Sequence, residues 1–380
     1  MTQIFSFLTF ASIVLVIFFS GTCKNDSPVK PPPPPATPDT TTHQYAWEEI
    51  LVSGNTGFVE FFDVWAFAPD NVWVVGKIQD YDYPDTCYPN VYHWNGKEWN
   101  FKSIAIRALL GPDTGIARVH APINAIWGFS PNDILLTSET GGRSYARIKI
   151  SGKDTTVESH FLIQYGGGQG HIWAVNPYNI YIAGDRGDAI FYDGNIFKAI
   201  NTNLPNFSGA IIDLWASDKS HIFASIMASN WPDSPDYFLM YNGTNWETLW
   251  QSDISPSLSD SVFFGFPGAT WGVTGEDSMY VSGLWIGKMK NDGTGKIRAL
   301  LKNDKYGAYT IRGTSKNNIF FAGGAGNIIH WNGSTFYQYK NFLDKPYYPH
   351  KVFVLENDVY IVGETFNSHT GVILHGRKNN

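Results

Sequence analysis

A repeat of about 41 residues runs through most of the chain, and it constrains the fold more than any other feature. Its clearest copy is residues 311–339, in which short aromatic and β-branched runs alternate with turn residues. The last turn contains Asn332-Gly333, a pair that accepts the positive φ angles of a tight hairpin. This copy predicts a four-stranded antiparallel meander. One such sheet cannot bury both faces alone, so neighbouring copies must cover them.

Seven copies of the innermost run can be aligned, and each is followed by a polar turn and a second strand. Consecutive runs are 62, 46, 42, 56, 41 and 41 residues apart, so the copies share one period and differ by insertions. Blades of β-propellers have repeats of this length. The runs are Val64-Trp65-Ala66, Ile126-Trp127-Gly128, Ile172-Trp173-Ala174, Leu214-Trp215-Ala216, Thr270-Trp271-Gly272, Ile311-Arg312-Gly313 and Val352-Phe353-Val354.

The seventh copy has no fourth strand before the chain ends. A matching strand stands at the other end, where residues 45–51 resemble the fourth strands near residues 97–101 and 245–249. Pairing these two ends would close the ring and remove an exposed sheet edge. The sequence therefore predicts an all-β, seven-bladed β-propeller of four-stranded antiparallel blades over residues 45–380, closed by an N-terminal strand that completes the last blade.

The first 44 residues are expected to lie outside this domain. Residues 4–19 form an apolar run that ends before Ser20-Gly21-Thr22-Cys23, which resembles the lipobox of bacterial lipoproteins. Residues 1–22 are thus predicted to be a lipoprotein-type signal peptide with Cys23 lipidated, and residues 23–44 a proline-rich linker. Another secretory signal and a retained membrane anchor are the alternatives. In each case we expect an extracytoplasmic, membrane-anchored protein of a bacterial cell envelope, at the outer membrane or the surface.

Composition excludes several classes of function. The formal net charge of -7 disfavours a nucleic-acid partner held by a basic surface. The two cysteines, Cys23 and Cys87, cannot form a disulfide framework or a zinc site alone. His93, His330 and His375 resemble a metal set, but equivalent positions carry Phe and Met, which favours packed strand residues. We expect no cofactor and no metal, and a monomer.

The extra length of the chain gathers in four insertions, at residues 77–90, 105–121, 227–237 and 251–268. Alternating strand directions place all four on one face of the disc. Two of them mix aromatic residues with carboxylates, which makes this face a candidate binding surface for a protein or a glycan. Surface insertions without a function, and a cation held by Asp80, Asp82 and Asp85, are the alternatives. The candidate ligand-binding residues are Asp80, Tyr81, Tyr83, Trp231, Asp233 and Tyr237.

A second candidate set comes from the central channel. Charged or polar residues stand two positions before the middle residue of several innermost runs, and an arginine replaces the tryptophan in the sixth copy. These side chains should converge on one axis, where acid and base groups can act together. Polar lining of a water-filled channel is the plainer interpretation. The set is Asp63, His171, Asp213, Arg312 and Lys351.

With this register, the repeat resembles that of a family of bacterial exported propellers. The resemblance covers about residues 46–376 and is strongest at residues 63–76 with 91–99, and at residues 311–336. It implies an extracytoplasmic, often lipid-anchored propeller, of a kind that mostly lacks an assigned function. We therefore predict a non-catalytic binding or scaffold module acting through its insertion-rich face, with no catalytic residue. The alternative is a hydrolase or lyase of polysaccharide that uses Asp63, His171 and Asp213.

Overall fold

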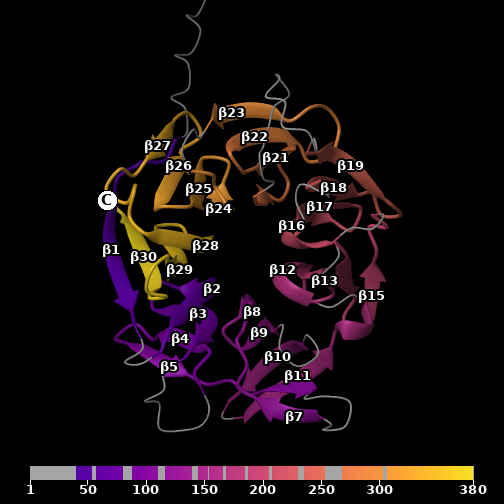
Figure 1. Cartoon of the computed structure of the whole chain (residues 1–380), viewed down its shortest axis with the longest axis vertical. Coiled ribbons are helices and arrows are strands. Elements are labelled where there is room, and N and C mark those ends of the chain that lie inside the picture. Colours follow the sequence, from indigo (N-terminus) through magenta and orange to yellow (C-terminus); the bar gives the residue numbers. More distant parts are fainter. Residues whose placement is uncertain are drawn as a thin grey trace, which may run out of the picture. The chain divides into compact units, whose positions relative to one another are not determined.

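Seven four-stranded antiparallel sheets stand in a ring around a central opening (Figure 1). The computed structural model describes residues 40–379 apart from 54–56, 80–87, 110–115, 139–143, 153, 166–167, 185–186, 205–207, 230–234, 253–267 and 303–305. Within each of the first six blades the strands follow one another in chain order, so each blade is a meander. The predicted all-β, seven-bladed propeller is confirmed.

The strands of the first four blades follow the predicted runs. Blade 1 contains β2 (Val59–Ala68), β3 (Asn71–Ile78), β4 (Val91–Trp94) and β5 (Trp99–Lys102). Blade 2 contains β8 (Ala125–Ser130), β9 (Asp133–Ser138), β10 (Ser144–Ser151) and β11 (Asp154–Phe161). Blade 3 contains β12 (Gly168–Asn176), β13 (Asn179–Gly184), β14 (Ala189–Tyr192) and β15 (Phe197–Ile200). Blade 4 contains β16 (Gly209–Asp218), β17 (His221–Ala228), β18 (Tyr237–Tyr241) and β19 (Trp246–Gln251).

The last blade takes its outer strand from the other end of the domain. Blade 5 contains β20 (Thr270–Gly272), β21 (Ser278–Val281), β22 (Trp285–Lys290) and β23 (Arg298–Lys302), and blade 6 contains β24 (Thr310–Ser315), β25 (Asn318–Gly323), β26 (Asn327–Trp331) and β27 (Phe336–Gln338). Blade 7 combines β28 (Tyr347–Val354), β29 (Asp358–Thr365) and β30 (Gly371–Lys378) with β1 (Tyr45–Val52). β1 pairs antiparallel with β30 over its whole length, from Tyr45 opposite Lys378 to Val52 opposite Gly371. The predicted closure by the N-terminal strand is confirmed.

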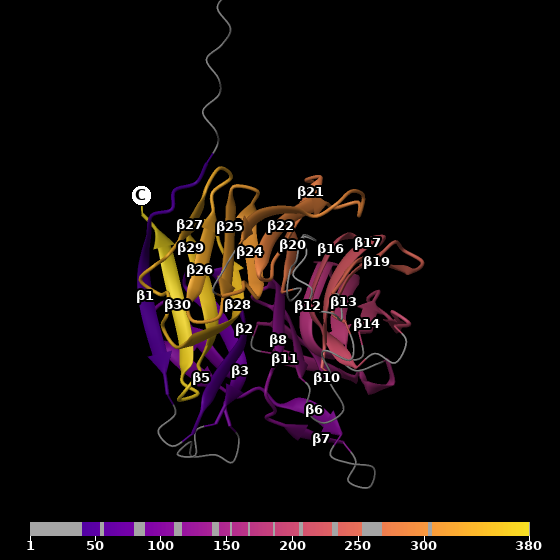
Figure 2. The ribbon, with the colours of Figure 1, turned by 45° about the horizontal axis from the view of Figure 1, so that its top comes forward.

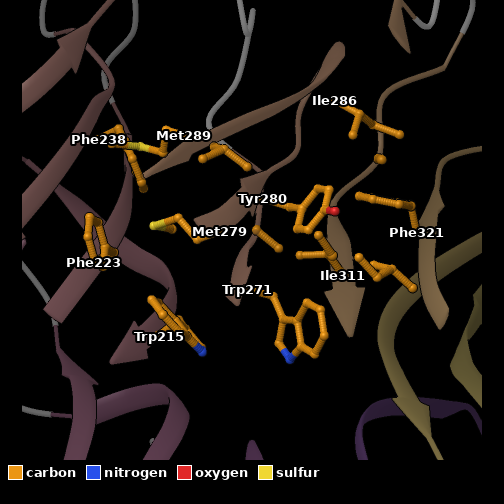
Figure 3. Packing of buried hydrophobic residues seen from close by; sticks show 14 of the residues in the cluster. Trp215, Phe223, Phe238, Trp271, Met279, Tyr280, Ile286, Met289, Ile311 and Phe321 are labelled. Carbon is orange, nitrogen blue, oxygen red and sulfur yellow. The ribbon is translucent and has the colours of Figure 1, made fainter. Parts of the chain in front are cut away.

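The hydrophobic cores lie between blades rather than within them. One cluster joins blades 4, 5 and 6, where Trp215, Phe238, Trp271, Met279 and Ile311 are buried together (Figure 3). Further clusters join the other neighbouring pairs around the ring, including blade 7 with blade 1. Because each blade buries its two faces against its two neighbours, the stability of any blade depends on the completeness of the ring.

The Trp-Ala and Trp-Gly pairs of the repeat have a direct packing role. A Cβ atom on Gly272 would lie 2.6 Å from Trp215 of the preceding blade, and one on Gly128 would lie 2.6 Å from Nε1 of Trp65. Each of these tryptophans therefore packs over the small residue of the next blade. Tryptophans of neighbouring blades also contact one another, as Trp65 does with Trp127, at 4.6 Å between ring centroids.

The disc has two different faces, which we name by their connections. The turn face carries the tight turns between first and second strands and between third and fourth strands. The loop face carries the connections between second and third strands and those between blades. The loop face also bears an additional hairpin, β6 (Ile106–Leu109) and β7 (Ile116–Val119), inside the insertion between blades 1 and 2 (Figure 2). The propeller repeat alone does not predict this hairpin.

Residues 40–44 run along the turn face beside blade 6 before entering β1. The Thr41 hydroxyl donates to the carbonyl of Asn317, and the Asn332 amide donates to the Thr41 carbonyl at 3.1 Å. The imidazole of His43 contacts that of His330 at 2.9 Å between Nδ1 atoms and the Thr335 hydroxyl at 3.0 Å. The chain therefore enters the propeller at the turn face, opposite the loop face.

Helix is scarce in the part of the chain that the structure describes. A single 3-10 turn, η1 (Ile163–Tyr165), precedes blade 3. Over those residues, no helix has the length and apolar character needed to cross a membrane. The predicted signal peptide, Cys23 and the alternative anchor at residues 4–19 lie outside the described residues.

Candidate functional site

The five predicted channel residues all lie on innermost strands. Asp63 belongs to β2, His171 to β12, Asp213 to β16, Arg312 to β24 and Lys351 to β28. The last four come from blades 3, 4, 6 and 7, and the structure brings them into one contact network. Contacts between non-adjacent blades can form only across the central channel, so these side chains bridge it.

Asp213 is the centre of the network and is only 2% exposed. Arg312 donates to both of its carboxylate oxygens, at 2.9 and 3.0 Å, in a bidentate pair. Lys351 Nζ lies 3.5 Å from Oδ1, and the backbone N–H of Thr270 in blade 5 donates to Oδ2 at 3.1 Å. Burial alone would raise the pKa of Asp213, but the charges of Arg312 and Lys351 outweigh it and hold the pKa well below its usual range.

His171 completes the network on the blade 3 side. Lys351 Nζ lies 2.7 Å from its Nδ1, and Oδ1 of Asp213 is 3.9 Å from the same nitrogen. Burial, and then the charge of Lys351, lower the pKa of His171 to about 3. The imidazole is therefore neutral at pH 7, and its Nδ1 accepts a hydrogen bond from the ammonium group of Lys351. Burial and the charge of Arg312 also lower the pKa of Lys351.

Asp63 has a different role from the other four. Its two carboxylate oxygens accept the backbone N–H groups of Val64 at 2.8 Å and of Ile126, in blade 2, at 3.0 Å. Burial raises its pKa, although the charge of Lys351 and these two hydrogen bonds oppose that shift. Asp63 thus ties blade 1 to blade 2. Thr310 does the same between blades 6 and 7, where its hydroxyl accepts from Val352 N at 3.1 Å.

These contacts decide what the channel set can do chemically. Asp213 is held as an ionised carboxylate by two cations, and the proton acceptor of His171 is occupied by Lys351. Both oxygens of Asp63 are bonded to backbone. Each of these three side chains therefore makes at least one contact that links its blade to another. The same repeat position, two residues before the middle of an innermost run, also forms hydrogen bonds to the backbone of the next blade.

The predicted loop residues are described only in part. Asp80, Tyr81, Tyr83, Trp231 and Asp233 lie outside the described residues, as do Asp82 and Asp85. Tyr237 is the first residue of β18 and packs against the core between blades 3 and 4. It is half-buried, and burial raises the pKa of its hydroxyl. Its place in the structure is therefore the edge of the loop face rather than the tip of a loop.

The described loop face carries an aromatic group that lies outside the predicted site residues. Tyr309 precedes β24, Tyr348 belongs to the start of β28, and Phe366 follows β29. The ring of Tyr348 lies 5.7 Å from that of Tyr309 and 5.5 Å from that of Phe366, between centroids. Phe366 is 51% exposed. A cluster of adjacent, partly exposed rings is the kind of surface that anchors a partner.

Comparison with solved structures supports the fold. No protein-family model and no curated protein matches the chain. It is similar to a structure described as YCF48 bound to D1 peptide, with a TM-score of 0.58, 15% identity, and coverage of 91% of this chain and 100% of that one. It is also similar to the WD40 β-propeller domain of Doa1, with a TM-score of 0.55, 12% identity, and coverage of 89% and 98%. The shared property is the fold.

A third similar structure is the extracellular domain of a putative one-component system from B. thetaiotaomicron. Its TM-score is 0.55 and its identity 8%, with coverage of 87% of this chain and 40% of that one. At these identities, the likenesses establish the propeller architecture alone.

Proposed function

We propose that the protein is an extracytoplasmic, lipid-anchored binding module that meets a partner through its loop face. This proposal rests on the positions of two features, which lie on opposite faces of the propeller. Residues 40–44 are hydrogen-bonded to the turn face, while the aromatic group of Tyr309, Tyr348 and Phe366 lies on the loop face. A tether that precedes residue 40 and is fixed to lipid at Cys23 would therefore join the turn face and leave the loop face available. The resemblance to exported propellers supports the same arrangement.

The channel favours a binding role over a role in catalysis at the axis. The hydrolase or lyase alternative relies on Asp63, His171 and Asp213, each of which already has a hydrogen-bond partner in another blade. Binding through a face requires no change in that network. A protein partner is favoured over a glycan because a similar propeller, YCF48, was solved bound to a peptide, and because clustered aromatic rings dominate protein interface hot spots.

A photo-crosslinking experiment tests the use of the loop face. The photoreactive residue p-benzoylphenylalanine replaces Phe366 on the loop face or Tyr178 on the turn face, which are 51% and 67% exposed. Because both sites are exposed, neither variant should lose more than about 0.5 kcal/mol of stability. We expect irradiation of the native host to give a discrete, protease-sensitive adduct from position 366 and none from position 178. An adduct from position 178 alone would overturn the assignment of the face, and a protease-resistant adduct would indicate a glycan.

Anchoring is tested separately by Cys23→Ala. Since membrane attachment is proposed to depend on the lipid added to Cys23, the variant should leave the membrane fraction or accumulate as an uncleaved precursor. Fractionation followed by mass spectrometry of the N-terminus measures both outcomes, and Cys87→Ala is the matched control. If the Cys23 variant fractionates with membranes as processed protein, the lipid anchor is refuted while the role of the loop face is unaffected.

A further inference from the structure

Two carboxylates and an imidazole meet at the seam where blade 7 joins blade 1. Glu60 projects from β2, Glu364 from β29, and His369 from the connection between β29 and β30. The seam is held at the same point by the backbone, where Val59 N donates to the His369 carbonyl at 2.7 Å. All three side chains therefore belong to the loop face, and they come from both sides of the closure.

The three ligand-type atoms converge on a small volume. Nδ1 of His369 lies 3.0 Å from Oε2 of Glu364 and 3.3 Å from Oε1 of Glu60, and all three atoms are within 4.8 Å of one another. Ligands bound at about 2.0–2.2 Å to a zinc-type ion stand about 3.0–3.5 Å apart at neighbouring coordination positions. Two of the three separations already match that geometry.

The charge distribution at this point favours a cation. A single imidazole N–H can make one well-aligned hydrogen bond, yet two carboxylate oxygens face the same nitrogen. The two glutamate side chains are largely covered, at 19% and 18% exposure, so water screens their mutual repulsion only in part. Lys77 lies opposite Glu60 in the pairing of β2 with β3, and its ammonium group lies over the Phe58 ring, 4.3 Å from the centroid.

A second histidine beside the cluster has an unsatisfied nitrogen. Nε2 of His350, on β28, is shielded from solvent and has no hydrogen-bond partner in the described part of the chain. It pairs with the carboxylate of Glu364, with 3.6 Å between Nε2 and Oε1, which is longer than a hydrogen bond. Glu364 thus lies between two imidazoles, those of His350 and His369. Such an outer histidine commonly orients a metal-binding carboxylate.

We propose that Glu60, Glu364 and His369 bind one divalent transition-metal ion of the zinc or manganese type, with His350 as the positioning residue for Glu364. The imidazole favours such an ion over calcium or magnesium, which prefer all-oxygen sites. Three protein ligands leave at least one coordination position for water or for a group of a partner. The ion would link blade 1 to blade 7 and so stabilise the seam on the loop face.

Calorimetric titration of the untagged chain, produced without its lipid, with Zn²⁺ tests the proposal, after the thiols of Cys23 and Cys87 have been blocked by alkylation. We expect one Zn²⁺ per chain, a rise in melting temperature that EDTA reverses, and weak or no binding of Ca²⁺ and Mg²⁺. His369→Ala and Glu364→Gln should each weaken Zn²⁺ binding at least about tenfold and remove the thermal shift. His350→Ala should weaken binding less than either, while leaving the stoichiometry at one.

His221→Ala is the matched control. His221 is also partly exposed and also pairs with a carboxylate, that of Asp218 at 3.0 Å, but among the described residues no second carboxylate pairs with it. This variant should bind Zn²⁺ like the parent. The proposal is overturned if the parent binds no Zn²⁺ or Mn²⁺, or if His369→Ala and Glu60→Gln bind as tightly as the parent. Far-ultraviolet circular dichroism of each variant separates loss of binding from loss of fold.

Discussion

Removing β1 is expected to destabilise the whole propeller, although it deletes only the outermost strand of one blade. Deletion of Tyr45–Val52 exposes the hydrogen-bonding edge of β30 and uncovers the core between blades 6 and 7. The rings of Trp47 and those of Tyr339 and Phe342 lie 5.0 and 5.1 Å apart and lose their contacts. We expect the free energy of unfolding to fall by more than about 4 kcal/mol. Urea denaturation followed by tryptophan fluorescence measures the change.

Two point substitutions in the same strand isolate the packing contribution. Trp47→Ala should cost about 3 kcal/mol because it leaves a cavity between aromatic rings. Leu51→Ala is the control, since Leu51 is 53% exposed and its loss should change stability by less than about 0.5 kcal/mol. If the deletion variant and Trp47→Ala both have the same urea midpoint as the parent, then the pairing of β1 with blade 7 does not contribute to the stability of the propeller.

The blades could be predicted because each one repeats local information. A tryptophan followed by Gly or Ala fixes both the innermost strand and its contact with the next blade, as Trp215 and Gly272 illustrate. Asn-Gly turns set the register of the outer hairpin, and Gly333 has the positive φ, 93°, that such a turn requires. The β6–β7 hairpin could not be predicted in this way, because it belongs to an insertion outside the repeat.

The channel set was predictable in position but not in chemistry. Register alone places Asp213 and Arg312 on the same axis, 99 residues apart in sequence. Which oxygen meets which nitrogen depends on side-chain directions across the channel, and the sequence does not encode these locally. The tie from Asp63 to the Ile126 backbone is equally invisible, since its acceptor is a side chain and its donor is a main-chain N–H of another blade.

The seam cluster had no signal in the sequence that a motif search would find. Glu60 and His369 are more than 300 residues apart, and the sequence analysis predicted no metal. Only the closure of the ring brings β2 beside blade 7, so the contact is a consequence of topology. The predicted roles of Asp80, Tyr81, Tyr83, Trp231 and Asp233 stay predictions, because those residues lie outside the described part of the chain.

Asp213→Asn is expected to be the most damaging single substitution in the channel. The amide keeps the volume of the side chain and an acceptor for Thr270 N, but it removes the charge that pairs with Arg312 and Lys351, which are both buried. Uncompensated buried cations cost about 3–5 kcal/mol. Asp218→Asn, at the exposed end of the same strand, should cost less than about 1 kcal/mol.

A double substitution distinguishes lost charge pairing from local damage. Adding Lys351→Met to Asp213→Asn removes one unpaired buried cation. The double variant should therefore be more stable than the Asp213→Asn variant. Additive costs would show instead that Asp213 acts through packing and the Thr270 hydrogen bond only.

Acidity supplies an independent check on Asp213. Its folded-state pKa lies well below the unfolded value of about 3.9, so its stabilisation is fully present above that value and is lost as the pH falls through the folded pKa. His171, whose folded pKa is about 3, also makes the protein less stable as the pH falls, but this loss begins already at about pH 6.5.

The stability of the parent should therefore fall in two stages on acidification. Asp213→Asn should lack the stage below about pH 4, so its deficit relative to the parent should be constant from pH 8 to pH 5 and should shrink below pH 4. A deficit that instead grows below pH 4 would mean that Asp213 is not the ionised centre of the channel network.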